Sequence, residues 1–321
     1  MIRINRTNLE KIAANHKERI CQDKGRSKGL EYRLRQVIKN TTLPAEASFL
    51  QDVLNDISLP VGQCLITGRP EYLAERIDYY QTTYAAILTK NFIDKVNSKV
   101  FFYENYEKWG AYELAIDLGM NVCPYCNRQY TFTLSRKGPG TRPQFDHFFT
   151  KSSHPYLSLS FYNLIPCCSI CNASLKGQLA FTLKTHLHPY LHGFSQLAKF
   201  KISPTSIDFI NGMPEKYDID FHFKTGIDPA IKTCIAGNVT AFALLDLYKM
   251  HKDYIDEIIL KARIYDNSYL ESILKQYQGT LFSDINDVKR MVFANYFSEI
   301  EHEKRVLAKL TADICEDLGI S

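Results

Sequence analysis

The sequence predicts a mainly helical α+β protein, in which two helical regions flank a small β-containing centre. Within residues 1–118, apolar and aromatic residues recur every three or four positions, for example from Leu73 to Val96, and this spacing is typical of amphipathic helices. From Gly119 the pattern changes to short β-type runs, turn residues and cysteines. From about Asn238 the helical spacing returns, with charged residues opposite the apolar faces.

These changes of pattern divide the chain into four parts. We expect a helical N-terminal region with a basic arm, a central module, an irregular or β extension, and a C-terminal helical bundle, at residues 1–118, 119–185, 186–235 and 236–321 respectively. Within the central module, strands are expected first, followed by one short helix. The expected strands are Gln129–Leu134, Gln144–Phe149 and Asn163–Pro166, and the expected helix is Ser169–Gln178.

Positive charge is concentrated in two parts of the chain. The whole chain carries a net charge of +4, but residues 1–40 hold 11 Lys/Arg against 4 Asp/Glu, and residues 119–185 hold 7 against 1. Local positive charge of this kind favours binding of a polyanion such as nucleic acid, because neutralising phosphates supplies most non-specific affinity. For the N-terminal arm alone, a solvated basic surface is an equally good interpretation.

Nine cysteines occur in a chain without a secretory signal or an apolar run long enough to span a membrane. We therefore expect a cytoplasmic protein, whose cysteines are free thiols or metal ligands. Two Cys-x-x-Cys pairs, Cys123/Cys126 and Cys168/Cys171, have the spacing of a tetrahedral structural Zn²⁺ site. Cys167 could replace Cys168 in that site, and unrelated or redox-active pairs are the alternatives.

The residues between and beside these pairs can support phosphodiester hydrolysis. His147 can accept a proton from water near neutral pH, and Asp146 offers an oxygen ligand to Mg²⁺ or Mn²⁺. Asn172, directly after Cys171, offers an amide oxygen to the same ion, and Lys176 could hold a phosphate from the same helical face. Asn163 is expected to bond backbone groups across the preceding loop and so to position His147.

Other polar residues have weaker predicted roles. Arg128 and Arg142 are expected to contact the nucleic-acid backbone. The histidines of the segment after the module, and the histidine of the preceding loop, are read as structural and not as a second metal site. These are His186, His188, His192 and His154.

The run CPYC…FDHFFTKSSHPYLSLSFYNLIPCCSICNASLKG resembles the HNH (ββα-metal) endonuclease family, in its zinc-containing branch. The resemblance covers roughly residues 120–180. It implies that His147 is the general base, Asn163 the central Asn and Asn172 the last residue of the motif, with Asp146 and Asn172 as ligands of one divalent ion. It also implies DNA cleavage that leaves a 5′-phosphate and a 3′-hydroxyl.

More loosely, the layout resembles PtuB-like HNH effectors of bacterial anti-phage systems, which implies an SMC/ABC-type ATPase as a partner. The sequence therefore predicts a metal-dependent HNH endonuclease, with DNA favoured over RNA as the substrate and no membrane association. An RNA- or tRNA-cleaving toxin-like effector is one alternative. A zinc-ribbon nucleic-acid-binding module without catalysis is another.

Overall fold

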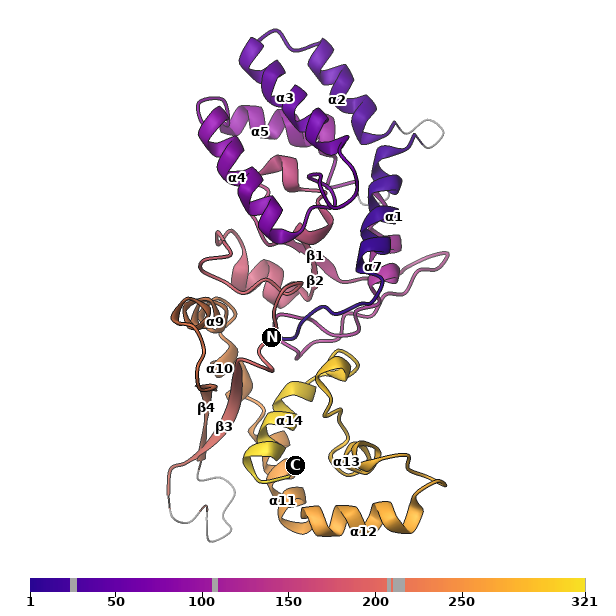
Figure 1. Ribbon diagram of the computed structural model, residues 1–321, viewed down its shortest axis with the longest axis vertical. Helices are drawn as coiled ribbons and strands as arrows, with labels where there is room; N and C mark the ends of the chain where they lie inside the picture. The colour runs from indigo at the N-terminus through magenta and orange to yellow at the C-terminus, as the bar shows by residue number, and fades with distance from the viewer. Residues whose placement is uncertain (24–27, 106–108, 207–208, 210–216, 321) are drawn as a thin grey trace.

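The computed structural model describes residues 1–23, 28–105, 109–206, 209 and 217–320. About half of the chain is helical, and the described strands form two separate two-stranded antiparallel sheets. The prediction of a mainly helical α+β fold is confirmed. In Figure 1 the N-terminal helices lie at the top, the sheet of β1 and β2 lies in the middle, and the C-terminal helices lie at the bottom.

The N-terminal region consists of helices that pack around the central module. They are α1 (Leu9–Cys21), α2 (Leu30–Lys39), α3 (Pro44–Ile57), α4 (Pro70–Tyr84), α5 (Lys90–Val96), the π-helix η1 (Asn97–Phe101) and α7 (Ala111–Leu118). Pro44 and Pro70 stand in the first turns of α3 and α4, where a missing N–H costs nothing. The ring of Phe49 on α3 meets that of Tyr156 of the central module at a centroid distance of 6.0 Å, so the two regions share one core.

Three arginines of the predicted basic N-terminal arm are used for internal contacts. Residues before α1 run along the central module, where the N–H of Ile2 donates to the carbonyl of Pro124 (2.8 Å). Arg6 forms an ion pair with Glu303 and also donates to the carbonyl of Leu118 (2.9 Å). Similarly, Arg19 pairs with Asp117, and Arg33 donates to the carbonyl of Val100 (2.6 Å). For these three arginines the structure therefore supports a structural role and not a basic arm open to a polyanion.

The central module contains a strand, a second strand and a helix, in that order. β1 (Gln144–His147) pairs with β2 (Leu164–Cys167), with Asp146 opposite Ile165. Between them lie two short 3-10 helices, η2 (Pro155–Leu157) and η3 (Phe161–Asn163), and β2 leads into the π-helix η4 (Ile170–Lys176). The strands expected at 144–149 and 163–166 are thus present with slightly different ends, and the expected helix is a π-helix.

The strand predicted at Gln129–Leu134 is wrong. This segment makes only isolated bridges, between Val122 and Tyr130 and between Leu134 and Thr141. β1 pairs with β2 across the loop that joins them, whereas this segment bridges only to residues close to it in the chain. Tyr130 and Phe132 are exposed, and Thr131 between them is buried.

The rest of the chain forms a β-hairpin followed by helices. β3 (Ala198–Pro204) and β4 (Tyr217–Phe223) are antiparallel, which agrees with the expected β extension. Helix α9 already begins at Pro229, before the boundary expected at residue 236. The other elements are α9 (Pro229–Ala241), α10 (Leu244–Lys249), α11 (Lys252–Ile264), α12 (Asn267–Tyr277), α13 (Ile285–Phe293), η5 (Glu299–Glu301) and α14 (Ala308–Asp317).

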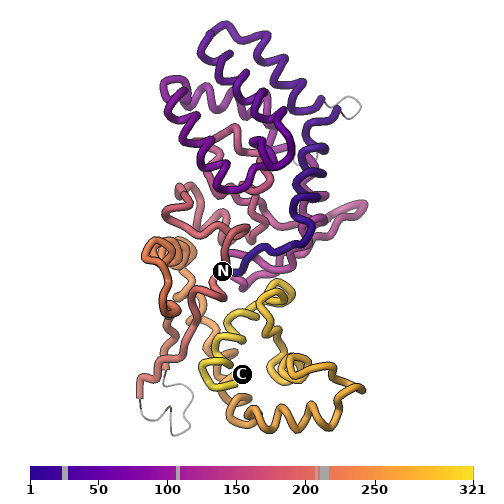
Figure 2. Tube along the Cα trace, viewed as in Figure 1, coloured from indigo at the N-terminus to yellow at the C-terminus, as the bar shows by residue number. Residues whose placement is uncertain are grey.

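A buried ion pair joins α14 to the hairpin. The ammonium of Lys309 lies 2.9 and 2.7 Å from the two carboxylate oxygens of Asp313, and it also donates to the carbonyl of Ala198 (3.1 Å). Asp313 accepts the N–H of Phe200 in β3 (3.0 Å). Figure 2 shows the amino terminus near the middle of the molecule, between the two helical regions. Among the helices that the structure describes, none is long and apolar enough to cross a membrane.

Candidate functional site

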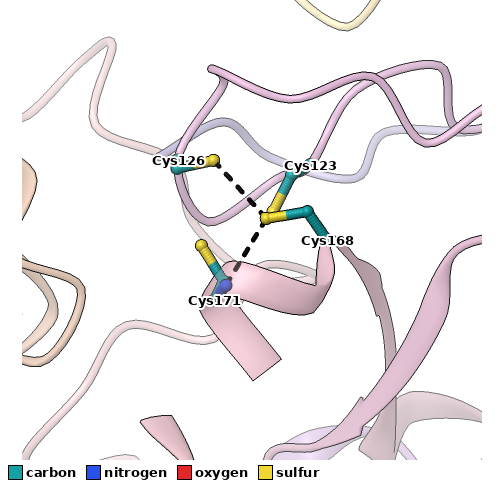
Figure 3. A group of neighbouring side chains, drawn as sticks. All are labelled: Cys123, Cys126, Cys168 and Cys171. Atoms are coloured by element: carbon teal, nitrogen blue, oxygen red, sulfur yellow. Dashed lines mark hydrogen bonds between the residues drawn. The ribbon is translucent and has the colours of Figure 1, made fainter. Parts of the chain in front are cut away.

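Four cysteines converge on one point beside the sheet. Figure 3 shows Cys123 and Cys126 on a loop, facing Cys168 and Cys171 at the start of η4. Their sulfurs all lie within 4.8 Å of one another, and those of Cys126 and Cys168 are 4.0 Å apart. Four thiolates at zinc's bond length of about 2.3 Å in a tetrahedron lie about 3.8 Å from each other, so the cluster fits a metal ion such as Zn²⁺. Among the described residues, this is the one group of three or more Cys, His, Asp or Glu ligands near enough to hold a metal.

Backbone groups support the thiolates. The N–H of Arg128 donates to the sulfur of Cys126, and the N–H of Cys171 donates to that of Cys168, each at 3.4 Å. Hydrogen bonds from the neighbouring thiols lower the pKa of Cys168, whereas burial raises the pKa of Cys123 well above its usual range, so the four thiols are not equally ready to ionise.

The structure also decides between Cys167 and Cys168. Cys167 is the last residue of β2, opposite Gln144, and it is fully buried outside the cluster. Burial raises the pKa of the Cys167 thiol well above its usual range, with the carboxylate of Asp146 as the next contribution. Cys167 is therefore a buried thiol, and Cys168 is the member of the cluster.

Asn127, the residue directly after the first Cys-x-x-Cys pair, connects the cluster to the C-terminal region. Asn127 has a positive φ of 50°, which asparagine tolerates better than most residues, and its N–H donates to the carbonyl of Cys123 (2.8 Å). Its side chain is fully buried, donates to the carbonyl of His302 (2.9 Å) and accepts the N–H of Lys309 (3.0 Å). The cysteine cluster therefore sits between the sheet and α14.

A second group of predicted residues lines a cavity of about 780 Å³ beside β1. Its wall includes Asp146, His147, Asn172, Lys176 and Arg142. Asp146 and His147 are neighbours in sequence, and both can reach one cavity because β1 ends at His147. The structure thus brings together most of the residues that the sequence singles out.

Asp146 and Asn172 have the chemistry to hold a hard divalent ion. Asp146 is 3% exposed; its Oδ1 accepts from the Lys176 ammonium (2.9 Å), and its Oδ2 accepts from the Tyr125 hydroxyl (2.6 Å). A carboxylate has about four acceptor sites, so each oxygen keeps one for a metal. Asn172 donates its amide N–H to Gln144 (2.8 Å), which orients its amide oxygen as the remaining ligand atom.

Lys176 does not occupy the place predicted for a phosphate-binding residue. Its side chain is 1% exposed, and its ammonium contacts Asp146 and also donates to the carbonyl of His147 (2.7 Å). The physical reason is that Asp146 is the single acid of this module, and a buried carboxylate requires a positive partner. Lys176 therefore acts as an internal counter-charge.

The ring of His147 is held in one orientation. Its Nε2 lies 2.9 Å from the carbonyl oxygen of Ser158, which can only accept, so Nε2 carries the proton and Nδ1 has the lone pair. Tyr103 packs edge-on against the ring at a centroid distance of 4.4 Å. Burial, and then the positive charges of Lys151 and Lys176, lower the pKa of His147 to about 3. The imidazole is therefore neutral at physiological pH.

Asn163 makes the contacts that the sequence predicts for it. Its side-chain amide donates to the carbonyls of Phe149 and Leu157 (both 3.0 Å) and accepts the N–H of Phe149 (2.7 Å). The side chain is fully buried, so it closes the loop that also carries Ser158, the partner of His147.

The two predicted arginines lie in different places. Arg142 lines the cavity, donates to the carbonyl of Pro143 (2.7 Å) and stacks near Tyr112, 5.7 Å from the ring centroid. Arg128 is not among the residues that line the cavity. Its guanidinium instead donates to Nε2 of His251 (2.9 Å). The prediction that Arg128 contacts substrate at this site is therefore not supported.

Three residues around the site have no counterpart in the sequence interpretation. Tyr125, between Cys123 and Cys126, donates its hydroxyl to Asp146. Gln144 accepts the side-chain N–H of Asn172 and so orients that amide. A polar residue enclosed by a Cys-x-x-Cys pair is a local signal that could have drawn attention to Tyr125. Tyr103 comes from the distant N-terminal region, and no local pattern marks it as a partner of His147.

Comparison of the chain with protein-family models gave no match, and neither the curated proteins nor the solved structures gave one. The interpretation of the site therefore rests on its own geometry.

Proposed function

We propose that this protein is a metal-dependent endonuclease of the HNH type, which hydrolyses phosphodiester bonds in DNA. The observation that carries the proposal is the meeting of Asp146, His147 and Asn172 in one cavity. These three residues come from a strand–strand–helix unit with a cluster of four thiols beside it. A base and two oxygen ligands side by side are what hydrolysis of a phosphodiester needs.

In this proposal Asp146 and Asn172 hold one Mg²⁺ or Mn²⁺ ion. When bound, such an ion supplies positive charge that stabilises the developing negative charge on the phosphate and on the leaving oxygen. Arg142, on the wall of the same cavity, orients the phosphodiester by a charge-assisted hydrogen bond. Lys176 pairs with the buried carboxylate of Asp146 and holds it at the end of β1.

His147 accepts the proton of the attacking water at Nδ1. The hydrogen bond from Nε2 to Ser158 keeps that lone pair in place, and Asn163 fixes the loop that carries Ser158. Burial keeps the ring neutral, so its Nδ1 lone pair is available to accept that proton.

In the same proposal the four-cysteine cluster is a structural zinc site. Zinc would join the loop of Cys123 to the start of η4, which also carries Asn172 and Lys176. It would contribute to folding and not to the chemical step.

The test is cleavage of supercoiled plasmid, linear DNA and total RNA by the purified protein, with Mg²⁺, Mn²⁺ or EDTA. His147→Ala should lose activity by at least about 100-fold, as expected when a general base is removed. His222→Ala is the matched control, because His222 is an exposed histidine in β4. Circular dichroism and zinc content should be the same in all three proteins.

Cleavage by His147→Ala at the wild-type rate would remove the proposed base. Absence of cleavage by the wild-type protein with every substrate and ion would support a zinc module without catalysis. Cleavage of RNA alone would keep the mechanism and change the substrate.

A further inference from the structure

Two aromatic side chains lie exposed near the candidate site. Tyr130 and Phe132 are 46% and 52% exposed, and their rings are stacked with a centroid distance of 4.7 Å and an interplanar angle of 15°. They stand two residues apart in the segment Gln129–Leu134, for which the sequence predicts a strand. Figure 2 shows the chain from there to β1 as a two-limbed projection on the right of the molecule. The outward faces of this aromatic pair are thus available to a flat ligand.

The aromatic pair lines a second hollow, of about 450 Å³, which is separate from the cavity of the candidate site but adjoins it. Ile170, 38% exposed at the start of η4, also lines it. The two cavities have three wall residues in common, which are Thr141, Arg142 and Gln144. A flexible polymer lying on the aromatic pair could therefore extend past Arg142 toward Asp146 and His147.

The charge around the hollow favours a polyanion. Among its lining residues there is no acid, and Arg142 is the charged member. Arg136 and Lys137, on the same projection, are exposed. The one acid in residues 119–185 is Asp146, whose charge is buried against Lys176. A protein partner would find here two aromatic rings but no acidic group to pair with its own cations.

We propose that the Tyr130–Phe132 pair stacks on the bases of unpaired nucleotides, and that the strand continues from there past Arg142 into the candidate site. This proposal rests on the proposed function, and it specifies the substrate as a nucleic acid with a single-stranded segment next to the scissile bond. Every base has a flat π-face, so stacking on an aromatic side chain tolerates any sequence, whereas the bases of a duplex are already stacked on each other.

Binding tests the proposal separately from catalysis. A fluorescein-labelled single strand of about 20 nucleotides and the matching duplex would be titrated with zinc-loaded protein in buffer without added Mg²⁺ or Mn²⁺, and the anisotropy recorded. The variant Tyr130→Leu/Phe132→Leu keeps apolar volume and removes the π-faces. Loss of stacking should weaken single-strand binding by about 5- to 150-fold per base and leave duplex binding nearly unchanged.

The control variant is Tyr269→Leu/Tyr277→Leu, which removes two tyrosines that are 50% and 39% exposed on α12. It should bind both ligands as the wild type does. A second readout is photocrosslinking of a single strand containing 5-iodouracil, followed by peptide mapping. Crosslinks should map to Tyr130 or Phe132 in the wild type.

Equal single-strand affinity of the Tyr130/Phe132 variant and the wild type, or crosslinks that map elsewhere, would overturn the proposal and leave the pair as a surface for a protein partner. Such a result with normal plasmid cleavage would leave the nuclease proposal intact. Conversely, crosslinks at Tyr130 in a protein that cleaves nothing would support the stacking surface and refute the endonuclease.

Discussion

Replacing Lys176 with methionine tests whether this residue neutralises a buried carboxylate. The change keeps the length of the apolar side chain and removes the ammonium, whose partners are Asp146 and the carbonyl of His147. The two charged side chains are 1% and 3% exposed, so water cannot replace the lost partner. We expect Lys176→Met to be strongly destabilising.

The magnitude follows from the separation of the charges. At an effective dielectric constant of about 20, unit charges at the 2.9 Å that separates the Lys176 nitrogen from the Asp146 oxygen attract by about 6 kcal/mol. Desolvation of both groups offsets part of this attraction, and removal of one partner of a buried pair typically costs about 3–5 kcal/mol. We expect a loss in that range. The double variant Lys176→Met/Asp146→Asn should be less destabilised than the sum of its single variants.

The assay is urea denaturation of the four proteins of this cycle, followed by circular dichroism. Lys304→Met is the matched control, because Lys304 forms an ion pair with Glu301 whose side chains are 48% and 26% exposed. Such a pair contributes about 1 kcal/mol or less. A loss in Lys176→Met as small as that of the control would refute the assignment of Lys176 as the necessary counter-charge.

Three further changes have defined outcomes. Cys168→Ser should lose bound zinc and destabilise the central module, whereas Cys167→Ser should retain the metal; equal zinc content by mass spectrometry would contradict this distinction. Asn163→Ala leaves the buried N–H and carbonyl of Phe149 without their partner and removes one of the two hydrogen bonds to the carbonyl of Leu157, so it should cost about 2 kcal/mol or more in a denaturation experiment. Burial lowers the pKa of His16 to about 4, so the unfolded chain takes up a proton first as the pH falls from 6.5. Stability should therefore fall between pH 6.5 and 4 by up to about 1.4 kcal/mol per pH unit for this group, and His16→Gln should reduce that slope in denaturation curves measured across the range.

The sequence was sufficient to place the parts of the site whose spacing is local. Cys168 and Cys171 form one side of the metal-capable cluster, and Asp146 and His147 lie in the predicted strand, which ends at His147 and not at Phe149. Asn163 bonds across its own loop because the partners, Phe149 and Leu157, are close in the chain. Short-range spacing determines these contacts.

The errors concern contacts whose partners are distant in the chain. Tyr130 and Phe132 alternate as in a strand, but a strand also needs a partner, and β1 pairs with β2, which lies further along the chain. The spacing of Lys176 from Asn172, directly after the second Cys-x-x-Cys pair, predicts a phosphate contact, whereas its ammonium is buried against Asp146. Asp146 is the single acid among residues 119–185, and this isolated carboxylate is the sequence feature that points to a buried ion pair with Lys176. Arg128 similarly finds a partner in His251, which lies more than a hundred residues later.

Asn127 has a consequence for how the chain assembles. The groups that satisfy its amide belong to residues 302 and 309, so they are synthesised long after the turn that they complete. Before α14 packs against it, the side-chain amide of Asn127 has none of these partners. The main-chain carbonyl of Asn127, which accepts the N–H of Leu307 in the folded protein, also lacks its partner. Both groups must then be hydrated by water. The segment around the first Cys-x-x-Cys pair therefore reaches its final packing only after residues 302–309 have been made.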